Sequence, residues 1–307
     1  MEGILAIFAD YTFQTVALGS ALLGLISGVV GSFAVLRRQS LLGDGISHAA
    51  LPGVVMAFIV TGSRNAEVLL LGGLISGLMA SFIIISIVRN SHIRFDSALA
   101  LVMSVFFGLG LVLLTWVQKM PNANQAGLSR FVFGQASTLL QKDVLLMAAT
   151  GIVLISLTAI FWKELKLFSF DSGFLQSLGF SNARMSAMLS FMVVMTVIIG
   201  IQTVGVILMS AMLVAPAVAA RQWTDKLSVM VSLSAAFGAV SGVAGTTASS
   251  LIEKLPTGPA IVVFVSGIVA LSVLFAPGRG VVYKAIRQAK KRSQINGGGG
   301  GADVGGV

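Results

Sequence analysis

Nine apolar stretches, each about as long as a membrane-spanning helix, alternate with short polar connections along this chain of 307 residues. A helix needs about 20 apolar residues to cross the hydrocarbon layer of a bilayer. Apolar residues make up 56% of the sequence, so the nine spans account for most of it. We place the spans at residues 11–36, 41–62, 66–88, 96–118, 143–162, 185–200, 203–220, 227–249 and 257–276. The sequence therefore predicts an all-α polytopic membrane protein with about nine transmembrane helices.

The sixth and seventh spans are separated only by Gly200–Ile201–Gln202, where we expect the chain to break. A helix followed by a re-entrant piece would instead leave eight crossings. With the N-terminus outside, 15 of the 20 basic residues fall in inner connections and the tail, and 5 fall outside. This excess on the inner side follows the positive-inside rule and favours nine crossings.

The same charge pattern divides the chain into three parts. Residues 1–10 are expected to be an extracytoplasmic N-terminus and residues 11–280 the transmembrane domain. Residues 281–307 are expected to form a cytosolic tail, first basic and then Gly-rich and disordered.

Composition excludes several classes of function. Charged residues make up only 10% of the chain, where a soluble domain has about a quarter. The chain has no cysteine, which excludes disulfides, iron–sulfur clusters and thiolate metal sites. The net charge of +9 comes from basic residues in short loops and the tail, and we interpret them as residues that orient the chain in the membrane rather than bind nucleic acid. There is no P-loop motif, so any work driven by ATP requires another subunit, and we expect a transport protein rather than an enzyme.

Asp44 and His48 lie inside the second span, four residues apart and hence on one face of a helix. Ionisable groups at membrane depth are costly and usually functional. The alternative is an ordinary helix cap, or a carboxylate near the interface that pairs with Arg37 or Arg38. Pro52 argues for a site, because proline frees the carbonyl four residues earlier, here that of His48. A carboxylate, an imidazole and a loosened backbone are the components of a cation site.

A carboxylate with a neutral imidazole suits Mn²⁺, Fe²⁺ or Zn²⁺. One Asp and one His cannot fill a coordination sphere, but a second copy of the chain would double them. A site within one copy would need Ser40, Ser47 or backbone carbonyls. Met209 and Met212 lie in the span that contains Pro216, a second candidate helix break, and we assign both methionines to the packed core.

The connection 163–184 is amphipathic, with Phe168, Phe170, Phe174, Leu175 and Leu178 among polar residues. It is expected to be either a helix lying in the lipid headgroups or a cytosolic helix on which another subunit docks. Glycines four residues apart also recur, and such pairs let membrane helices approach closely. They are Gly24/Gly28, Gly73/Gly77 and Gly238/Gly242.

The run Arg38–Gly53, which contains Asp44-Gly-Ile-Ser47-His48, resembles the signature of the permeases of manganese, zinc and iron ABC importers. The run Val204–Ala220 is similar to the second hallmark of that family. Phe170-Asp171 followed by Leu178-Gly179 resembles its coupling helix, and Phe133-Gly134 its outer segment. Leu175 is a departure, since the family usually has a small Ala there.

This resemblance implies a fold like that of type II ABC importers in a bacterial plasma membrane. It implies two cytosolic ABC ATPase subunits docked on the coupling helix, a second permease copy, and an extracytoplasmic metal-binding lipoprotein or periplasmic protein. It assigns the channel metal ligands to Asp44 and His48, with the metal as cargo and no permanently bound cofactor. Two alternatives remain: a metal transporter or channel independent of ATP, and a permease for siderophore or cobalamin chelates.

Overall fold

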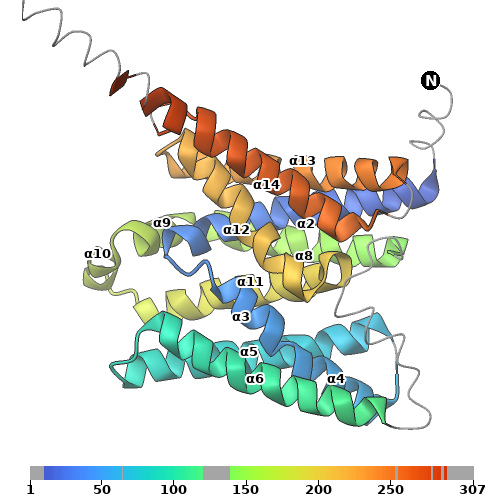
Figure 1. Ribbon diagram of the computed structural model, residues 1–307. Coiled ribbons are helices and arrows are strands. Elements are labelled where there is room, and N and C mark those ends of the chain that lie inside the picture. Colours follow the sequence, from blue (N-terminus) through green and yellow to red (C-terminus); the bar gives the residue numbers. More distant parts are fainter. Residues whose placement is uncertain are drawn as a thin grey trace, which may run out of the picture.

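The structure is a computed structural model that describes residues 10–63, 65–119, 139–252, 255–277, 279–284 and 287–288. All regular elements in these residues are helices, as predicted. The first six are α2 (Tyr11–Leu36), α3 (Leu42–Ala49), α4 (Leu51–Thr61), α5 (Ala66–Asn90), α6 (Phe95–Gln118) and α8 (Gln141–Ile160). The others are α9 (Trp162–Phe170), α10 (Ser172–Ser177), α11 (Asn182–Val204), α12 (Val206–Trp223), α13 (Leu227–Leu251) and α14 (Thr257–Phe275). In Figure 1 the long helices lie side by side, and α10 is at the end opposite the start of α2.

Within the described residues, eight helical segments are long and apolar enough to cross a membrane, with α3 and α4 counted together as Leu42–Thr61. Helix α12 is an additional apolar helix of 18 residues, which packs against α2, α13 and α14. The polytopic all-α architecture is therefore confirmed. Helix α12 supplies the seventh of the nine apolar stretches.

The connections that the charge pattern placed inside gather at one end of the bundle. There the Arg37 guanidinium donates to the Phe168 carbonyl at 2.9 Å. At the same end Arg279 donates to the Arg221 carbonyl and pairs with Asp225. We call this the α10 end.

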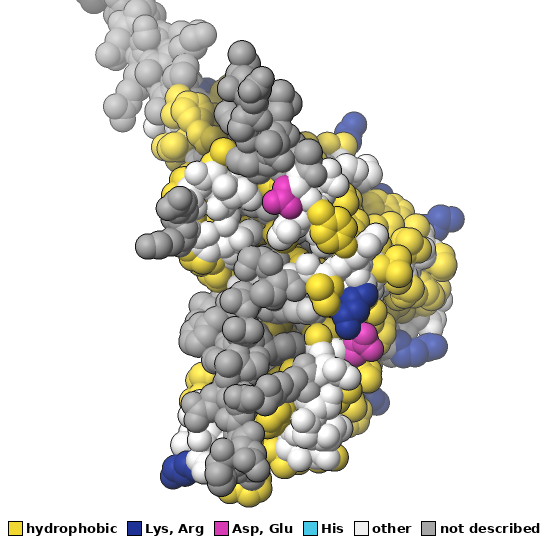
Figure 2. Space-filling model, turned by 90° about the vertical axis from the view of Figure 1, so that its right-hand side faces the viewer, with side chains coloured by type: hydrophobic (Ala, Val, Ile, Leu, Met, Phe, Trp, Pro, Cys, Tyr) yellow, Lys and Arg dark blue, Asp and Glu magenta, His cyan; other side chains and the backbone are white. Residues whose placement is uncertain are grey.

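Different residues meet at the opposite end of the bundle. The Tyr11 hydroxyl donates to Gln141 at 3.2 Å, and Lys142 lies 3.7 Å from Glu67. Figure 2 looks onto this end, where charged side chains are scattered and hydrophobic ones cover much of the outer wall. The contacts at the two ends thus agree with the inner and outer sides that the charge pattern predicted for these residues.

The break between α11 and α12 lies at Gly205, and the break predicted at Gly200–Ile201–Gln202 was wrong. Gly205 has φ 91°, a left-handed conformation that only glycine adopts readily. Gly200 stays helical, and a Cβ added there would overlap the Met209 sulfur. Gly200 is therefore needed for packing, whereas Gly205 turns the chain, and sequence alone does not separate these two uses of glycine.

Helices α2 and α13 pack along the predicted small-residue stripes. A Cβ on Gly24 would collide with the Gly238 backbone, and one on Gly28 would collide with the Ser234 backbone. The Ser234 hydroxyl donates across this interface to the Gly28 carbonyl at 2.8 Å. The prediction of close helix approach is confirmed for these two helices.

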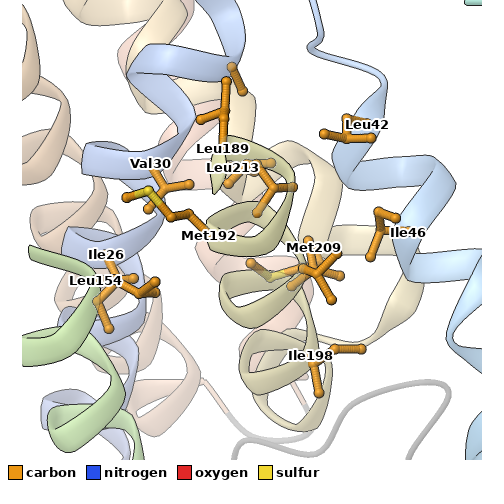
Figure 3. Packing of buried hydrophobic residues seen from close by; sticks show 14 of the residues in the cluster. Ile26, Val30, Leu42, Ile46, Leu154, Leu189, Met192, Ile198, Met209 and Leu213 are labelled. Carbon is orange, nitrogen blue, oxygen red and sulfur yellow. The ribbon is translucent and has the colours of Figure 1, made fainter. Parts of the chain in front are cut away.

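A buried hydrophobic cluster joins α2, α3, α8, α11 and α12 (Figure 3). Met209 and Met212 belong to it and are completely buried, so their assignment to the core is confirmed. Leu213 of α12 and Ile46 of α3 also belong to this cluster, and α3 is thereby anchored in the centre of the molecule.

The connection 163–184 is not one helix, because Asp171 divides it into α9 and α10. The Asp171 carboxylate accepts the Phe174 N–H at 2.9 Å and so caps α10. In the basic part of the tail, residues 281–284 are helical. Phe133-Gly134, residues 1–9 and the Gly-rich segment lie outside the described residues.

Candidate metal site

Asp44 and His48 face each other across one turn of α3, with 3.6 Å between Asp44 Oδ1 and His48 Nε2. Two donors on a tetrahedral ion at about 2.1 Å each lie about 3.4 Å apart, so this spacing fits one shared metal. The Asp44 side chain is 38% exposed and that of His48 is 22% exposed. Both are therefore partly screened from solvent while remaining open to a ligand.

The alternative roles for Asp44 do not match the geometry. The N-cap of α3 is Leu41, so Asp44 lies inside the helix. Arg37 instead donates to the Phe168 carbonyl, and its guanidinium carbon lies 4.0 Å above the Phe168 ring. The ion-pair partner that the structure gives Asp44 is His48.

The imidazole of His48 is held by Phe107 of α6. The two rings meet edge to face, with centroids 4.8 Å apart and an interplanar angle of 72°. The Nδ1 atom of His48 is buried and has no hydrogen-bond partner among the described residues. This packing leaves Nε2, on the Asp44 side, as the imidazole nitrogen that is available to a ligand. The sequence contained no signal that marked Phe107 for this position.

Two glycines place α3 deep in the bundle. A Cβ on Gly43 would overlap Leu213 of α12, and one on Gly45 would overlap Leu99 of α6. Helix α3 therefore lies close against both neighbours. The Asp44–His48 face is thereby fixed relative to α12, the helix that contains Pro216.

The chain is loosened between α3 and α4, near Pro52, as the sequence predicted. Pro52 has no N–H to offer the His48 carbonyl, as predicted, and the next carbonyl along the chain, that of Ala49, finds a new partner. The Ser76 hydroxyl of α5 donates to Ala49 O at 2.6 Å, while the Ala50 N–H donates to the Ile46 carbonyl at 2.9 Å. A neighbouring helix thus stabilises the break, as polar side chains do in membrane proteins.

No group of three or more His, Cys, Asp or Glu side chains that could hold a metal occurs in the part of the chain that the structure describes. Ser47 is fully buried and donates to the Gly43 carbonyl of its own helix. It is therefore not available as a further ligand. One copy supplies two donors, which is half of a four-coordinate site.

A second candidate surface, which we call the α10 face, lies on α10 and the residues next to it at the α10 end. Phe170, Phe174 and Leu178 are about half exposed there. Leu175, the departure from the family pattern, is completely buried in the core cluster. Gly179 ends this segment with φ 88°. The unusual leucine therefore affects how α10 rests on the bundle and leaves the exposed face unchanged.

Comparisons with known proteins identify related membrane transport proteins. The sequence profile of a family described as "ABC 3 transport family" matches residues 9–276. The chain is 51% identical over 290 residues to the zinc transport system membrane protein TroC of Treponema pallidum (strain Nichols), covering 94% of this chain and 97% of the relative. It is 44% identical over 283 residues to the manganese transport system membrane protein MntC of Bacillus subtilis (strain 168), covering 92% of this chain and 65% of the relative.

Among solved structures, the chain is similar to PsaBC from Streptococcus pneumoniae in complex with Fab. The TM-score is 0.80 with 28% sequence identity, over 93% of this chain and 99% of that one. The similarity in sequence and the similarity in fold to these proteins thus both extend over nearly the whole chain.

Proposed function

Because this chain belongs to the ABC 3 transport family, we propose that it is the membrane-spanning subunit of an ATP-driven importer that carries a divalent transition metal ion into the cytoplasm. It is a multi-pass membrane protein of a bacterial transport system. Manganese is the proposed cargo, with zinc and iron as the other candidates. One relative is named for manganese transport and another for zinc transport.

The observation that carries this proposal is the Asp44–His48 pair inside a membrane span. A carboxylate oxygen and an imidazole nitrogen 3.6 Å apart can bind one divalent ion of the manganese, iron and zinc group. A complete coordination site within one chain would retain the metal too firmly for transport. A site that takes two donors from each of two permease copies binds the metal only while the two pairs lie opposite each other. We therefore assign Asp44 and His48 to a transient site between two copies of the chain.

The α10 face supports a role in energy coupling. Three large exposed apolar side chains, at the end of α9, on α10 and directly after α10, favour a protein partner at this position. We assign this face to contact with two cytosolic ATPase subunits, which would hydrolyse the ATP. In this arrangement the α10 end is cytosolic, and an extracytoplasmic lipoprotein or periplasmic protein delivers the metal at the opposite end.

The test is accumulation of radioactive manganese in cells that express this permease with its ATPase and metal-binding protein. Asp44→Asn and His48→Gln keep the side-chain volume nearly constant while removing the metal donors. We expect either change to lower uptake at least about tenfold, with unchanged amounts of assembled complex in the membrane.

His92→Gln and Asp96→Asn are matched controls, because both residues are exposed in or beside the 91–94 connection at the α10 end. They should transport at the normal rate. Normal uptake by the Asp44 and His48 variants would contradict the site. Uptake that continues without ATP hydrolysis would instead favour a transporter or channel independent of ATP.

A further inference from the structure

A cavity of about 660 Å³ lies at the α10 end, apart from the Asp44–His48 pair. The connections α2–α3 and α5–α6 form part of its wall, and α9, α10 and the start of α11 complete it. Arg37, Arg38 and Arg89 line this cavity, opposed by one carboxylate, Asp96. The charge of the lining therefore favours an anion.

Three polar atoms of the lining are buried without a hydrogen-bond partner in the described structure. They are Nε of Arg37, Oε1 of Gln39 and Oδ1 of Asn182. Gln39 is only 8% exposed although it belongs to a connection between helices. Buried polar groups almost always have partners, so three unpaired ones around one cavity indicate a ligand. A half-turn of either amide presents its NH₂ group to an anion instead.

Arg37 is held in position for such a role. One of its terminal nitrogens donates to the Phe168 carbonyl, and the guanidinium lies against the Phe168 ring. Burial lowers the pKa of the Arg37 guanidinium, but an arginine remains charged at physiological pH. An anion next to Nε would satisfy this buried charge. Phosphate oxygens suit the planar donor set of guanidinium groups well.

The cavity also has an apolar side. Ile85 and Val88 of α5 and Phe95 of α6 belong to its lining. Further along α5, exposed apolar side chains continue at helical spacing toward Arg89, as Leu71, Ile75, Met79 and Phe82. A ligand with a charged phosphate and a hydrocarbon chain matches this arrangement, because the chain can follow α5 into the bilayer.

We propose that this cavity binds the phosphate group of an anionic phospholipid, with Arg37, Arg38, Arg89, Gln39 and Asn182 as its donors. Basic pockets between membrane helices on the cytoplasmic side bind such headgroups. The site is independent of the transported metal, since it shares no residue with the Asp44–His48 pair. It gives the permease a contact with the membrane next to the α10 face.

The test is a titration of phosphatidylglycerol into the purified full chain in neutral detergent, with bound lipid counted by native mass spectrometry. Phosphatidylcholine, which has no net charge, and inorganic phosphate are titrated in parallel. We expect tight binding of phosphatidylglycerol and little binding of phosphatidylcholine. Binding of inorganic phosphate with equal strength would assign the same site to a soluble phosphate and remove the role of the acyl chain.

The variant R38Q/R89Q removes two charges but leaves the Arg37–Phe168 contact intact, and Q39L removes the buried amide. Each should weaken phosphatidylglycerol binding at least about tenfold, because hydrogen bonds to charged groups are the strong ones. The control K163Q/K226Q removes two charges from exposed positions outside the cavity, and it should bind like the unmodified chain.

Three results would overturn the proposal. They are an unchanged affinity of R38Q/R89Q and Q39L, an equal loss in K163Q/K226Q, or the absence of binding to the unmodified chain. The titration is repeated on the complex with the ATPase subunits. Loss of lipid binding upon assembly would also contradict the proposal, because the ATPase subunits would then occupy or close the cavity in the complete importer.

Discussion

Ser76 of α5 donates its hydroxyl to the Ala49 carbonyl of α3 at 2.6 Å, one residue after His48. This bond joins the proposed metal site to a helix 27 positions further along the chain. It stabilises the backbone at the α3–α4 break, and the position of the His48 backbone depends on it. A residue without metal-binding chemistry thus supports the site.

Removing the Ser76 hydroxyl tests whether this hydrogen bond stabilises the proposed metal site. We expect Ser76→Ala to destabilise the protein by about 0.6 kcal/mol and at most about 1.7 kcal/mol, the average and the maximum measured for hydrogen bonds between membrane helices. It should also reduce manganese uptake, because the α3–α4 break loses its partner. The measurements are thermal unfolding in detergent and uptake in cells. Thr61→Ala is the control, since that exposed hydroxyl bonds only to Ala57 and Ser63, near the end of its own helix and away from α5. Equal effects of the two changes would contradict the proposed support.

Phe107 is expected to set the orientation of the His48 imidazole. An edge-to-face pair contributes about 0.5–1.5 kcal/mol beyond its buried area. Phe107→Leu should therefore raise the metal concentration for half-maximal uptake roughly two- to tenfold, with a smaller effect on the maximal rate. The dependence of uptake on metal concentration measures both quantities. A fall in maximal rate alone would show that Phe107 acts elsewhere in the transport cycle.

The close packing of α2 on α13 predicts that glycine-to-alanine changes lower stability strongly at this contact and not at open positions. Gly238→Ala places a Cβ against the Gly24 carbonyl, so the two backbones must separate. Overpacking usually costs about 1–3 kcal/mol, and a backbone neighbour cannot move aside as a side chain can. We expect a clearly lower unfolding temperature or loss of folded protein. Gly108→Ala and Gly267→Ala meet no atom within 4 Å and should be neutral.

Substitutions at two neighbouring residues of α10, Phe174 and Leu175, should have different effects: one on binding of the ATPase and the other on stability. Phe174→Ala changes a half-exposed side chain and should weaken capture of the ATPase subunits without lowering the unfolding temperature. Leu175→Ala empties a buried position and should cost about 2–5 kcal/mol of stability. Copurification of the ATPase and thermal unfolding are measured on both variants. Full ATPase capture by Phe174→Ala would exclude this face as the contact.

Much of the local structure follows from the sequence, because a helix is built from bonds between residues four apart. The lengths of the spans, the shared face of Asp44 and His48, and the small-residue stripe of α13 all follow from helical periodicity. The break at Gly205 was missed for a related reason. Gly200 and Gly205 look alike in sequence, and only the nearby Met209 sulfur shows that the first is a packing position.

The sequence by itself determined that this chain crosses a membrane many times and carries one carboxylate–imidazole pair inside a span. Only the tertiary structure decided that Phe107 holds the imidazole, that Ser76 supports the break, and that Arg37 and Arg89 line one cavity. The physical reason is the range of the interactions. Backbone hydrogen bonds and side-chain periodicity act within a few residues, whereas the choice of neighbouring helices depends on the fit of surfaces far apart in the chain.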